Sequence, residues 1–178
     1  MMITLEKEAI GVMRTNTGQS LESISNQKPV LLVFLRHFGC QFCREALDDI
    51  SKMTSEIERN GLVLVFVHMA DREVAETYFA KFNLSGSLHI SDPECRFYAA
   101  FGLVKGSFSQ LFGLHAFLRG FSVQSKYGAE IGKRLGDSYQ MPGIFGICNG
   151  LVRLRFLHKD AAVRPDYNSL VKRCCETE

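Results

Sequence analysis

The stretch Val30-Leu-Leu-Val-Phe-Leu35, followed by Arg36-His-Phe-Gly-Cys-Gln-Phe-Cys-Arg44, decides the fold of this 178-residue chain. Its first six residues are continuously apolar, which is typical of a strand covered on both faces, as in a parallel sheet. From Cys40 onward, apolar residues recur every three or four positions as far as Ile57, and Asn60-Gly61 follows as a helix stop. We therefore predict a buried strand that turns directly into one long helix beginning near Cys40.

The next segments repeat this alternation of strand and helix. Leu62-Val-Leu-Val-Phe-Val67 predicts a second buried strand, and Asp71 is the predicted N-cap of a second helix. Leu88 to Ile90 suits a short strand, and Asp92-Pro93 predicts an N-cap with proline at the first helical position. Strands and helices that alternate in this way predict a right-handed βαβ unit with parallel strands.

The last third of the chain has a different pattern. Residues 103–140 are rich in glycine and phenylalanine, and we interpret them as an insertion with one broad amphipathic helix. Two apolar runs, Gly143 to Ile147 and Leu151 to Leu157, flank the turn Asn149-Gly150 and predict a β-hairpin. A final helix begins at Asp166. We therefore expect residues 1–178 to form a single α/β domain whose central mixed sheet is flanked by helices.

Composition excludes several classes of function. The 21 basic and 19 acidic residues leave a formal net charge of +2, which is too small to indicate a nucleic-acid partner. The segment from Met1 to Arg14 has no continuous apolar stretch, so we expect neither a signal peptide nor a membrane span. We therefore expect a cytoplasmic protein whose six cysteines are reduced and form no disulfide framework.

The pair in Cys40-Gln-Phe-Cys43 lies where strand turns into helix, and this position favours a reactive thiolate. Unpaired N–H groups and the positive end of the helix dipole stabilise negative charge there. Arg36, Arg44 and a protonated His37 would act in the same direction. Such surroundings lower a cysteine pKa from ~8.5 to roughly 3.5–7.5. Because the second thiol follows three positions later, the pair can close a disulfide, and two-electron chemistry then needs no cofactor.

Two other interpretations of the pair remain open. A C-x-x-C sequence is also half of a zinc site, but zinc needs two more ligands, and the adjacent Cys174-Cys175 is poorly shaped to supply them. Both cysteines of the pair could also simply belong to the core. Near the end of the chain, Cys174 and Cys175 are expected to be incidental exposed thiols. We favour the redox interpretation and predict no metal.

The order of elements, with Met141-Pro142 ahead of the hairpin, resembles the thioredoxin fold, with Pro142 at that fold's cis-proline position. Three further stretches narrow the resemblance to one group of proteins. Arg36 to Arg44, Asp92-Pro93 with Phe97-Tyr98, and Phe101 to Gly106 resemble the peroxiredoxin-like 2 group of the alkyl hydroperoxide reductase and thiol-specific antioxidant superfamily. The resemblance covers about residues 20 to 175, insertion included. It implies a redox-active cysteine pair at Cys40 and Cys43 with antioxidant or peroxide-related activity.

Two functional hypotheses follow. In the first, the chain is an enzyme: one thiolate attacks a peroxide or disulfide, the second closes the Cys40–Cys43 disulfide, and an external thiol restores the pair. The helix N-terminus favours Cys40 as the attacking residue, whereas the peroxiredoxin analogy favours Cys43, so the order stays open. In the second hypothesis the pair is a redox sensor, and the Phe-rich insertion forms a partner or homodimer surface.

Overall fold

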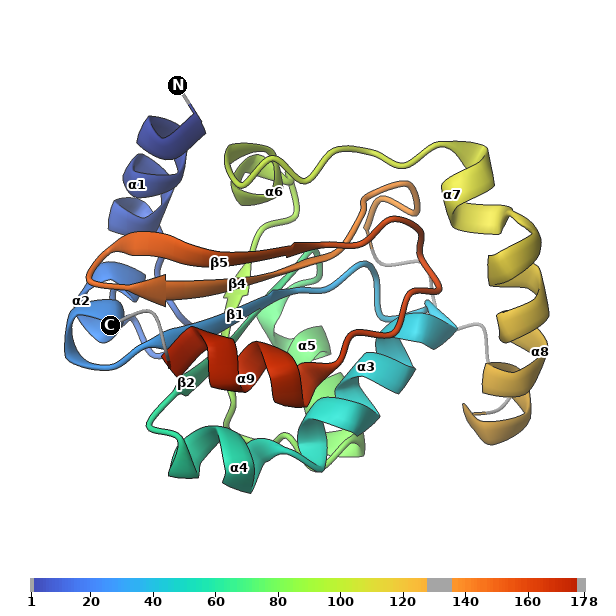
Figure 1. Cartoon of the computed structure of the whole chain (residues 1–178), viewed down its shortest axis with the longest axis horizontal. Coiled ribbons are helices and arrows are strands. Elements are labelled where there is room, and N and C mark those ends of the chain that lie inside the picture. The colour runs from blue at the N-terminus through green and yellow to red at the C-terminus, as the bar shows by residue number, and fades with distance from the viewer. Residues whose placement is uncertain (1, 128–135, 176–178) are drawn as a thin grey trace.

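The computed structural model describes residues 2–127 and 136–175, and within them five strands form one mixed sheet in the order β3-β2-β1-β4-β5 (Figure 1). The central strand β1 runs parallel to β2 and antiparallel to β4, and β2 runs parallel to β3. The hairpin turns at Asn149 and Gly150, which both have positive φ, as an Asn-Gly turn of this kind requires. The strands are β1 (Val30–Phe34), β2 (Val63–His68), β3 (Leu88–Ser91), β4 (Gly143–Cys148) and β5 (Leu151–Leu157).

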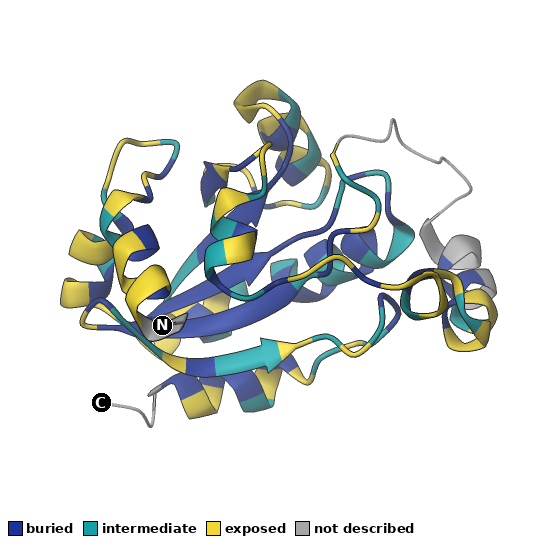
Figure 2. Cartoon of the chain, turned by 90° about the horizontal axis from the view of Figure 1, so that it is seen from above, coloured by how far each residue is buried: buried dark blue, intermediate teal, exposed yellow. Residues whose placement is uncertain are grey.

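Helices cover both faces of this sheet, which is why β1 is apolar at every position. Leu31 and Val33 face one layer, made mainly by α3, α4, α5 and α9, while Leu32 and Phe34 face the other, made by α1, α2 and α6. Figure 2 shows the resulting buried centre in dark blue between the more exposed helices. The helices are α1 (Met2–Val12), α2 (Leu21–Gln27), α3 (Gln41–Ser51), α4 (Thr54–Arg59), α5 (Arg72–Lys81), α6 (Arg96–Ala100), α7 (Phe108–Phe112), α8 (Leu114–Tyr127) and α9 (Tyr167–Cys175).

The helix predicted to run from Cys40 to Ile57 is in fact two helices, α3 and α4. Hydroxyl side chains explain the interruption, because Ser51 Oγ donates to the Asp48 carbonyl at 2.8 Å and Thr54 Oγ1 donates to the Ser51 carbonyl at 3.2 Å. These bonds compete with the helical ladder and favour a break. The apolar period continues across the break, which is why the sequence suggested one helix.

The insertion also holds two helices where one was predicted. Gly113 separates α7 from α8 with ψ of 175°, and a Cβ at this position would meet the Ser109 carbonyl oxygen at 2.2 Å. Ser107 and Gln110 form a capping box at the start of α7. In Figure 1 both helices lie at one end of the molecule, with α8 beside α3.

Two further elements differ from the prediction. The helix α6 begins at Arg96 and not at Pro93, because the Asp92 carboxylate accepts from the N–H groups of Arg96 and Phe97 and so caps it from four and five residues away. Helices α1 and α2 had not been predicted. The first packs on the sheet through Ala9 and Ile10, where the ion pair between Glu6 and Arg155 of β5 adds a polar contact.

The side chain of Tyr98 links the ends of β1 and β2 by hydrogen bonds, close to the cysteine pair. It is fully buried, and its hydroxyl donates to the carbonyl oxygens of Leu35 at 2.5 Å and Val67 at 3.2 Å, directly after β1 and within β2. Burial raises its pKa well above the usual range, so the phenol stays a donor. The position of the residues after β1 therefore depends on this hydroxyl.

Replacing Tyr98 with Phe removes the donor and leaves the Leu35 carbonyl without this bond. We expect the free energy of unfolding to fall by about 1–3 kcal/mol. Chemical denaturation followed by far-UV circular dichroism measures the change. Tyr139→Phe, at an exposed position, is the matched control and should unfold as the native chain does. Equal stability of the two variants would show that the Tyr98 bonds contribute nothing.

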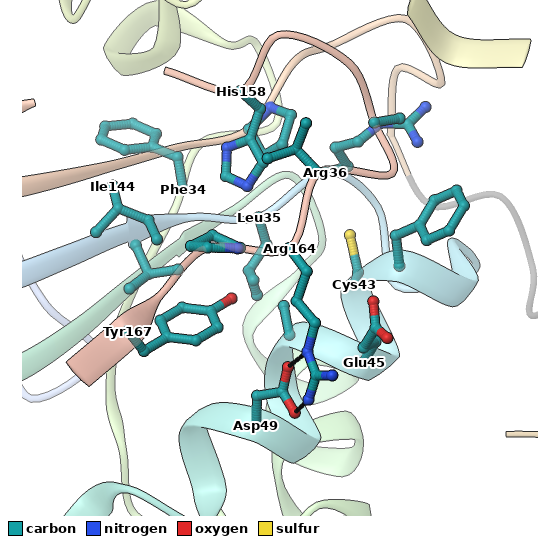
Figure 3. A pocket seen from close by; sticks show the side chains of 17 residues that line it. Phe34, Leu35, Arg36, Cys43, Glu45, Asp49, Ile144, His158, Arg164 and Tyr167 are labelled. Carbon is teal, nitrogen blue, oxygen red and sulfur yellow. Dashed lines mark hydrogen bonds and ion pairs between the residues drawn. The ribbon is translucent and has the colours of Figure 1, made fainter. Parts of the chain in front are cut away.

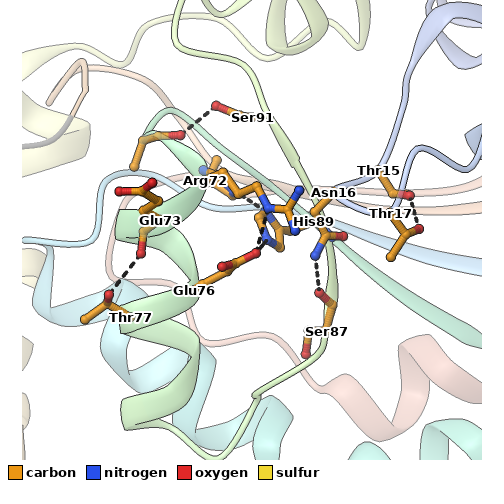
Figure 4. A network of polar contacts seen from close by, with 12 residues as sticks. Thr15, Asn16, Thr17, Arg72, Glu73, Glu76, Thr77, Ser87, His89 and Ser91 are labelled. Carbon is orange, nitrogen blue, oxygen red and sulfur yellow. Dashed lines mark hydrogen bonds and ion pairs between the residues drawn. The ribbon is translucent and has the colours of Figure 1, made fainter.

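A polar network links α5 to β3 on the face of the sheet that α5 covers (Figure 4). The buried rings of His68 and His89 share a hydrogen bond of 2.8 Å between Nε2 and Nδ1. His89 Nε2 lies 3.8 Å from a carboxylate oxygen of Glu76, which also accepts from Arg72 at 2.8 Å. Burial lowers the pKa of His68 to about 3 and also lowers that of His89. The pair is therefore neutral at physiological pH.

The neutral pair predicts loss of stability in acid. Because the unfolded chain protonates histidine near pH 6.5 and the folded chain protonates His68 only near pH 3, stability should fall as pH decreases from about 6.5, by up to ~1.4 kcal/mol per pH unit from His68. Unfolding measured between pH 7.5 and 5 should show this slope, and a His68→Phe variant should show a shallower one. An identical slope in the variant would rule out His68 as its source.

Candidate functional site

The cysteine pair begins helix α3 directly after the loop that follows β1. Cys40 is the N-cap residue, with extended backbone, and its carbonyl accepts from the N–H groups of Cys43 and Arg44 at 3.1 and 3.2 Å. Its own N–H donates to the His37 carbonyl at 2.9 Å, which closes the loop as a tight turn. The two cysteines are only 7% and 5% exposed. Both thiols thus lie at the positive end of a helix, shielded from solvent.

Arg36 connects the Cys40 thiol to a distant part of the chain. The arginine is 5% exposed, and its Nη1 donates to Cys40 Sγ at 3.2 Å. Its Nε and Nη2 donate to the carbonyl oxygens of Gln140 at 3.2 Å and Ser138 at 2.5 Å. A buried guanidinium needs partners for its charge and its donors, and here a thiolate supplies the charge.

The same surroundings move the two thiol pKa values in opposite directions. The pKa of Cys40 is lowered from 9.0 to about 6, chiefly because the Cys43 thiol donates a hydrogen bond to it. The charge of Arg36 and the N–H groups of Cys43 and Phe42 act in the same direction, against the effect of burial. The pKa of Cys43 is raised, because it is the donor in that bond and because it is buried. Cys40 is therefore mostly ionised at pH 7, and Cys43 stays protonated.

A groove with a volume of about 620 Å³ leads to Cys40 from the outside. Helices α7 and α8 form its apolar wall, while Arg36, Gln41 and Ser138 provide polar groups near the thiol. Gly120 of α8 lies close to Gln41, since a Cβ there would meet Gln41 Nε2 at 2.8 Å. The apolar residues of the wall are Phe42, Phe108, Leu111, Phe112, Ala116 and Phe117.

A second, small cavity of about 30 Å³ lies on the other side of the pair, against Cys43 (Figure 3). Two carboxylates line it, and each pairs with an arginine from a later segment: Glu45 with Arg119 of α8 at 2.6 Å, and Asp49 with Arg164 at 2.5 Å. Burial lowers the pKa of His158, on the same wall, to about 4. The cavity can hold about one or two water molecules.

Comparison with known proteins assigns this arrangement to a family. The family model described as AhpC/TSA matches residues 8–134, which include the cysteine pair and most of the sheet. The chain belongs to the AhpC/TSA family. It is 27% identical over 160 residues to a prostamide/prostaglandin F synthase of Salmo salar, which covers 84% of this chain and 76% of the relative. It is also 26% identical over 148 residues to human peroxiredoxin-like 2C, covering 78% of this chain and 64% of the relative.

Solved structures share this fold. A bacterioferritin comigratory protein of Xanthomonas campestris, whose structures concern alkyl peroxide reduction, superposes with a TM-score of 0.65 at 13% identity. The superposition covers 94% of this chain and 92% of that one. The predicted thioredoxin-like fold and the resemblance to peroxiredoxin-like proteins are thus confirmed, and the chain is a thiol-dependent oxidoreductase by family. Within residues 2–127 and 136–175 we find no helix long and apolar enough to cross a membrane.

The residues predicted to support the cysteine pair lie at different distances from it, and only some of them contact a thiol or line the groove. Arg36 contacts Cys40, and His37 lines the groove beside it. Arg44 is buried in the first turn of α3, and the arginine whose charge lowers the pKa of Cys40 is Arg36. Pro142 borders the cavity against Cys43, just before β4.

The sequence left the isomer of the peptide bond before Pro142 open, and in the structure the Met141–Pro142 bond is trans. The preceding backbone is held in this form by its neighbours. The Met141 N–H donates to the Val104 carbonyl at 3.3 Å, and the Gln140 amide donates to the Met141 carbonyl at 3.3 Å. Trans is also the ordinary isomer before proline.

Cys174 lies at the far end of β1 from the cysteine pair. Cys174 was expected to be exposed but is buried in α9, with its Sγ 3.8 Å from the carbonyl of Val30, where β1 starts. Cys40 lies past the other end of β1, so Cys174 is placed neither to resolve an oxidised Cys40 nor to complete a zinc site with it. The side chain of Cys175 is outside the described residues. In the described part of the chain, no three His, Cys, Asp or Glu side chains gather as metal ligands.

Sequence reasoning missed the residues that come from far along the chain. The carbonyls of Ser138 and Gln140 carry no sequence signal, because any residue has a carbonyl. The pairs of Glu45 with Arg119 and Asp49 with Arg164 join residues 74 and 115 positions apart. Asp49 sits one turn beyond Glu45 in α3, and this spacing was the one available hint that both acids face the same side.

The geometry predicts the pH dependence of alkylation. Cys40 should react with iodoacetamide with a midpoint near pH 6, and Arg36→Met should move that midpoint upward by about one pH unit or more, since the cation is lost. Mass spectrometry of the alkylated peptides identifies the reacting residue. Lys105→Met removes an exposed cation and is the control. An unchanged midpoint in Arg36→Met would contradict the role given to the arginine.

Proposed function

We propose that Cys40 and Cys43 cycle between dithiol and disulfide, and that the chain reduces disulfides or peroxides by this cycle. The observation that carries the proposal is the contact of a buried arginine with Cys40 Sγ at 3.2 Å. A thiolate is the nucleophile in both reactions, and Arg36 together with the Cys43 thiol stabilises it at neutral pH. The family membership supports the same chemistry.

The cycle begins with Cys40. Its thiolate attacks one sulfur of a disulfide and forms a mixed disulfide, while the other sulfur leaves as a thiolate and takes up a proton. With a peroxide, the thiolate attacks one oxygen, the O–O bond breaks, and an alcohol or water leaves once it is protonated. Cys40 is then a sulfenic acid. In both cases the oxidised sulfur remains on Cys40, within reach of its neighbour on the same helical turn.

Cys43 then completes the oxidation. Its thiol loses a proton and attacks Cys40, and this step releases the second substrate thiol or, from the sulfenic acid, water. An external thiol reductant restores the pair by two exchanges and is itself oxidised to a disulfide. No metal or cofactor takes part in this cycle. The raised pKa of Cys43 suits it to wait as a protonated thiol until Cys40 is oxidised.

The proposal extends to the surroundings of the site. The supporting residues are Arg36 as the thiolate's cation, His37 in the groove, Pro142 at the cavity, and Arg44 in the first turn of α3. The reaction needs a pool of reduced thiols, which fits the cytoplasm. A sensor that reacts once, with α7 and α8 as its partner or homodimer surface, is the second candidate, and the apolar wall of the groove is the observation in its favour.

Serine variants test the order of the two cysteines. Cys40→Ser should lose reaction with hydrogen peroxide, an organic hydroperoxide and a disulfide, while Cys43→Ser should still react once and trap the sulfenic acid or mixed disulfide on Cys40. Stopped-flow kinetics with mass spectrometry of the products follow both. Cys95→Ser, which removes a half-buried thiol at the start of α6, is the control and should behave as the native chain does.

Turnover separates the two candidate functions. An enzyme consumes many equivalents of an added dithiol reductant per chain, whereas a sensor stops after one oxidation. If the Cys40→Ser variant traps a sulfenic acid or a mixed disulfide on Cys43, the proposed order in which the two cysteines attack is reversed. The chain could also react with peroxide no faster than an unactivated thiol does, while a disulfide substrate rapidly oxidises the Cys40–Cys43 pair. Dithiol exchange would then be the activity.

A further inference from the structure

Helix α8 is apolar on two opposite faces, although only one of them is covered. Ala116, Gly120 and Val123 are buried on the face that packs against α3. Leu114, Phe117 and Leu118 recur three and four positions apart on the other face and are exposed. A surface helix normally carries polar residues on its outer face. The exposed apolar face of α8 therefore needs an explanation other than the fold.

Together with α7, this face makes one continuous surface, which we call the α7–α8 apolar surface. Large hydrophobic side chains in solvent are unusual when they gather within one short segment. Leu114, for example, is 74% exposed, and Phe108 is 71% exposed. The surface consists of Phe108, Phe112, Leu114, Phe117 and Leu118.

Polar contacts hold the two helices in this position. Arg119 donates to both carboxylate oxygens of Glu45 and to the Ala162 carbonyl. On α7, the Gln110 amide donates to the Lys159 carbonyl at 3.0 Å. His115 Nδ1 lies 3.0 Å from a carboxylate oxygen of Asp160. These contacts come from α3 and from the loop after β5, so the apolar surface is presented by an anchored helix pair.

The surface continues into the groove that leads to Cys40. Phe108, Phe112 and Phe117 belong to both, whereas Leu114 and Leu118 lie on the surface but do not line the groove. A small peroxide or disulfide inside the groove would therefore leave the two leucines in water. The five side chains expose roughly 600 Å², if a phenylalanine offers about 200 Å² and a leucine slightly less. That approaches the about 800 Å² that each partner of a standard protein interface buries.

We propose that the α7–α8 apolar surface docks a polypeptide whose apolar residues flank a disulfide-bonded cysteine, and that the groove delivers this cysteine to Cys40. The inference rests on the proposed function, because it names the substrate class of the same site. Continuity of the surface with the thiol groove favours a partner that reacts there. At the inner end of the groove, the polar groups of Gln41 and Ser138 can bind peptide N–H and carbonyl groups near the sulfur.

The reaction with such a partner balances without any other reagent. The Cys40 thiolate bonds to the partner cysteine's sulfur, the partner disulfide breaks, and its second sulfur leaves and is protonated. Cys43 then attacks Cys40, giving its proton to the departing partner thiol. The partner disulfide is reduced to two thiols, and the Cys40–Cys43 pair is oxidised. Apolar contact beyond the groove raises the rate by holding the partner sulfur near the thiolate.

A pair of chromogenic peptides tests the proposal. Each has about twelve residues and one cysteine disulfide-bonded to 5-thio-2-nitrobenzoate; leucine and phenylalanine flank the cysteine in one, and serine replaces them in the other. Release of the coloured thiolate gives the second-order rate constant. We expect the full-length native chain to react with the apolar peptide about tenfold faster than with the serine peptide, as a few buried anchors would produce.

The double variant Leu114→Ser/Leu118→Ser should lose most of this preference, because it changes the surface but not the groove. Its rate with glutathione disulfide, which has no large apolar side chain to contact the two leucines, should be unchanged. Leu5→Ser/Val12→Ser is the matched control, since it removes two exposed apolar residues from α1, and it should keep the preference. Circular dichroism of both double variants checks that they are folded.

Several results would overturn the inference. Equal rates with the two peptides, or equal losses in the two double variants, would show that the surface does not select apolar partners. A native chain that sediments as a dimer while the Leu114/Leu118 variant sediments as a monomer would assign the surface to a second copy of the chain. If both peptides, glutathione disulfide and peroxide all fail to react through Cys40, the proposed function itself fails, and this outcome differs from the other two.

Discussion

The buried guanidinium of Arg36 is the constraint around which the site is arranged. It leaves the end of β1 and meets three partners at once: the Cys40 thiol and the carbonyls of Ser138 and Gln140. Without an anion the cation would be costly to bury, so the arginine and the thiolate stabilise each other. Because two of its donors bind the segment before β4, the same side chain also fixes one wall of the groove.

The two thiols differ although they share one helical turn. Cys40, as N-cap, receives the helix N–H groups, the arginine and the hydrogen bond of its neighbour, while Cys43 lies one turn later, against the small second cavity. The fold thus separates an ionised thiol that faces the groove from a protonated thiol that faces the interior. Tyr98 helps to position both thiols, because its hydroxyl binds the carbonyl oxygens of Leu35 and Val67 near the strand ends that lead to the cysteine loop.

Local pattern made part of this architecture predictable. The apolar run of β1, the period of α3 and the Asn149-Gly150 turn each follow from a few neighbouring residues, and they placed the cysteine pair at a helix start. What was missed depends on long-range or competing contacts. The break between α3 and α4 comes from hydroxyl groups that compete with the backbone, and the carbonyl partners of Arg36 lie over a hundred residues away. Burial of Cys174 beneath the sheet likewise depends on where α9 docks.

Disulfide mapping of the oxidised chain tests the central claim most directly. The native protein is reduced, treated with one equivalent of oxidant, alkylated in acid and digested without reductant, and the linked peptides are identified by mass spectrometry. Our account predicts a dominant link between Cys40 and Cys43, with Cys95, Cys148 and Cys174 recovered as alkylated thiols. A dominant link from Cys40 to any other cysteine, or to a second chain, would contradict it.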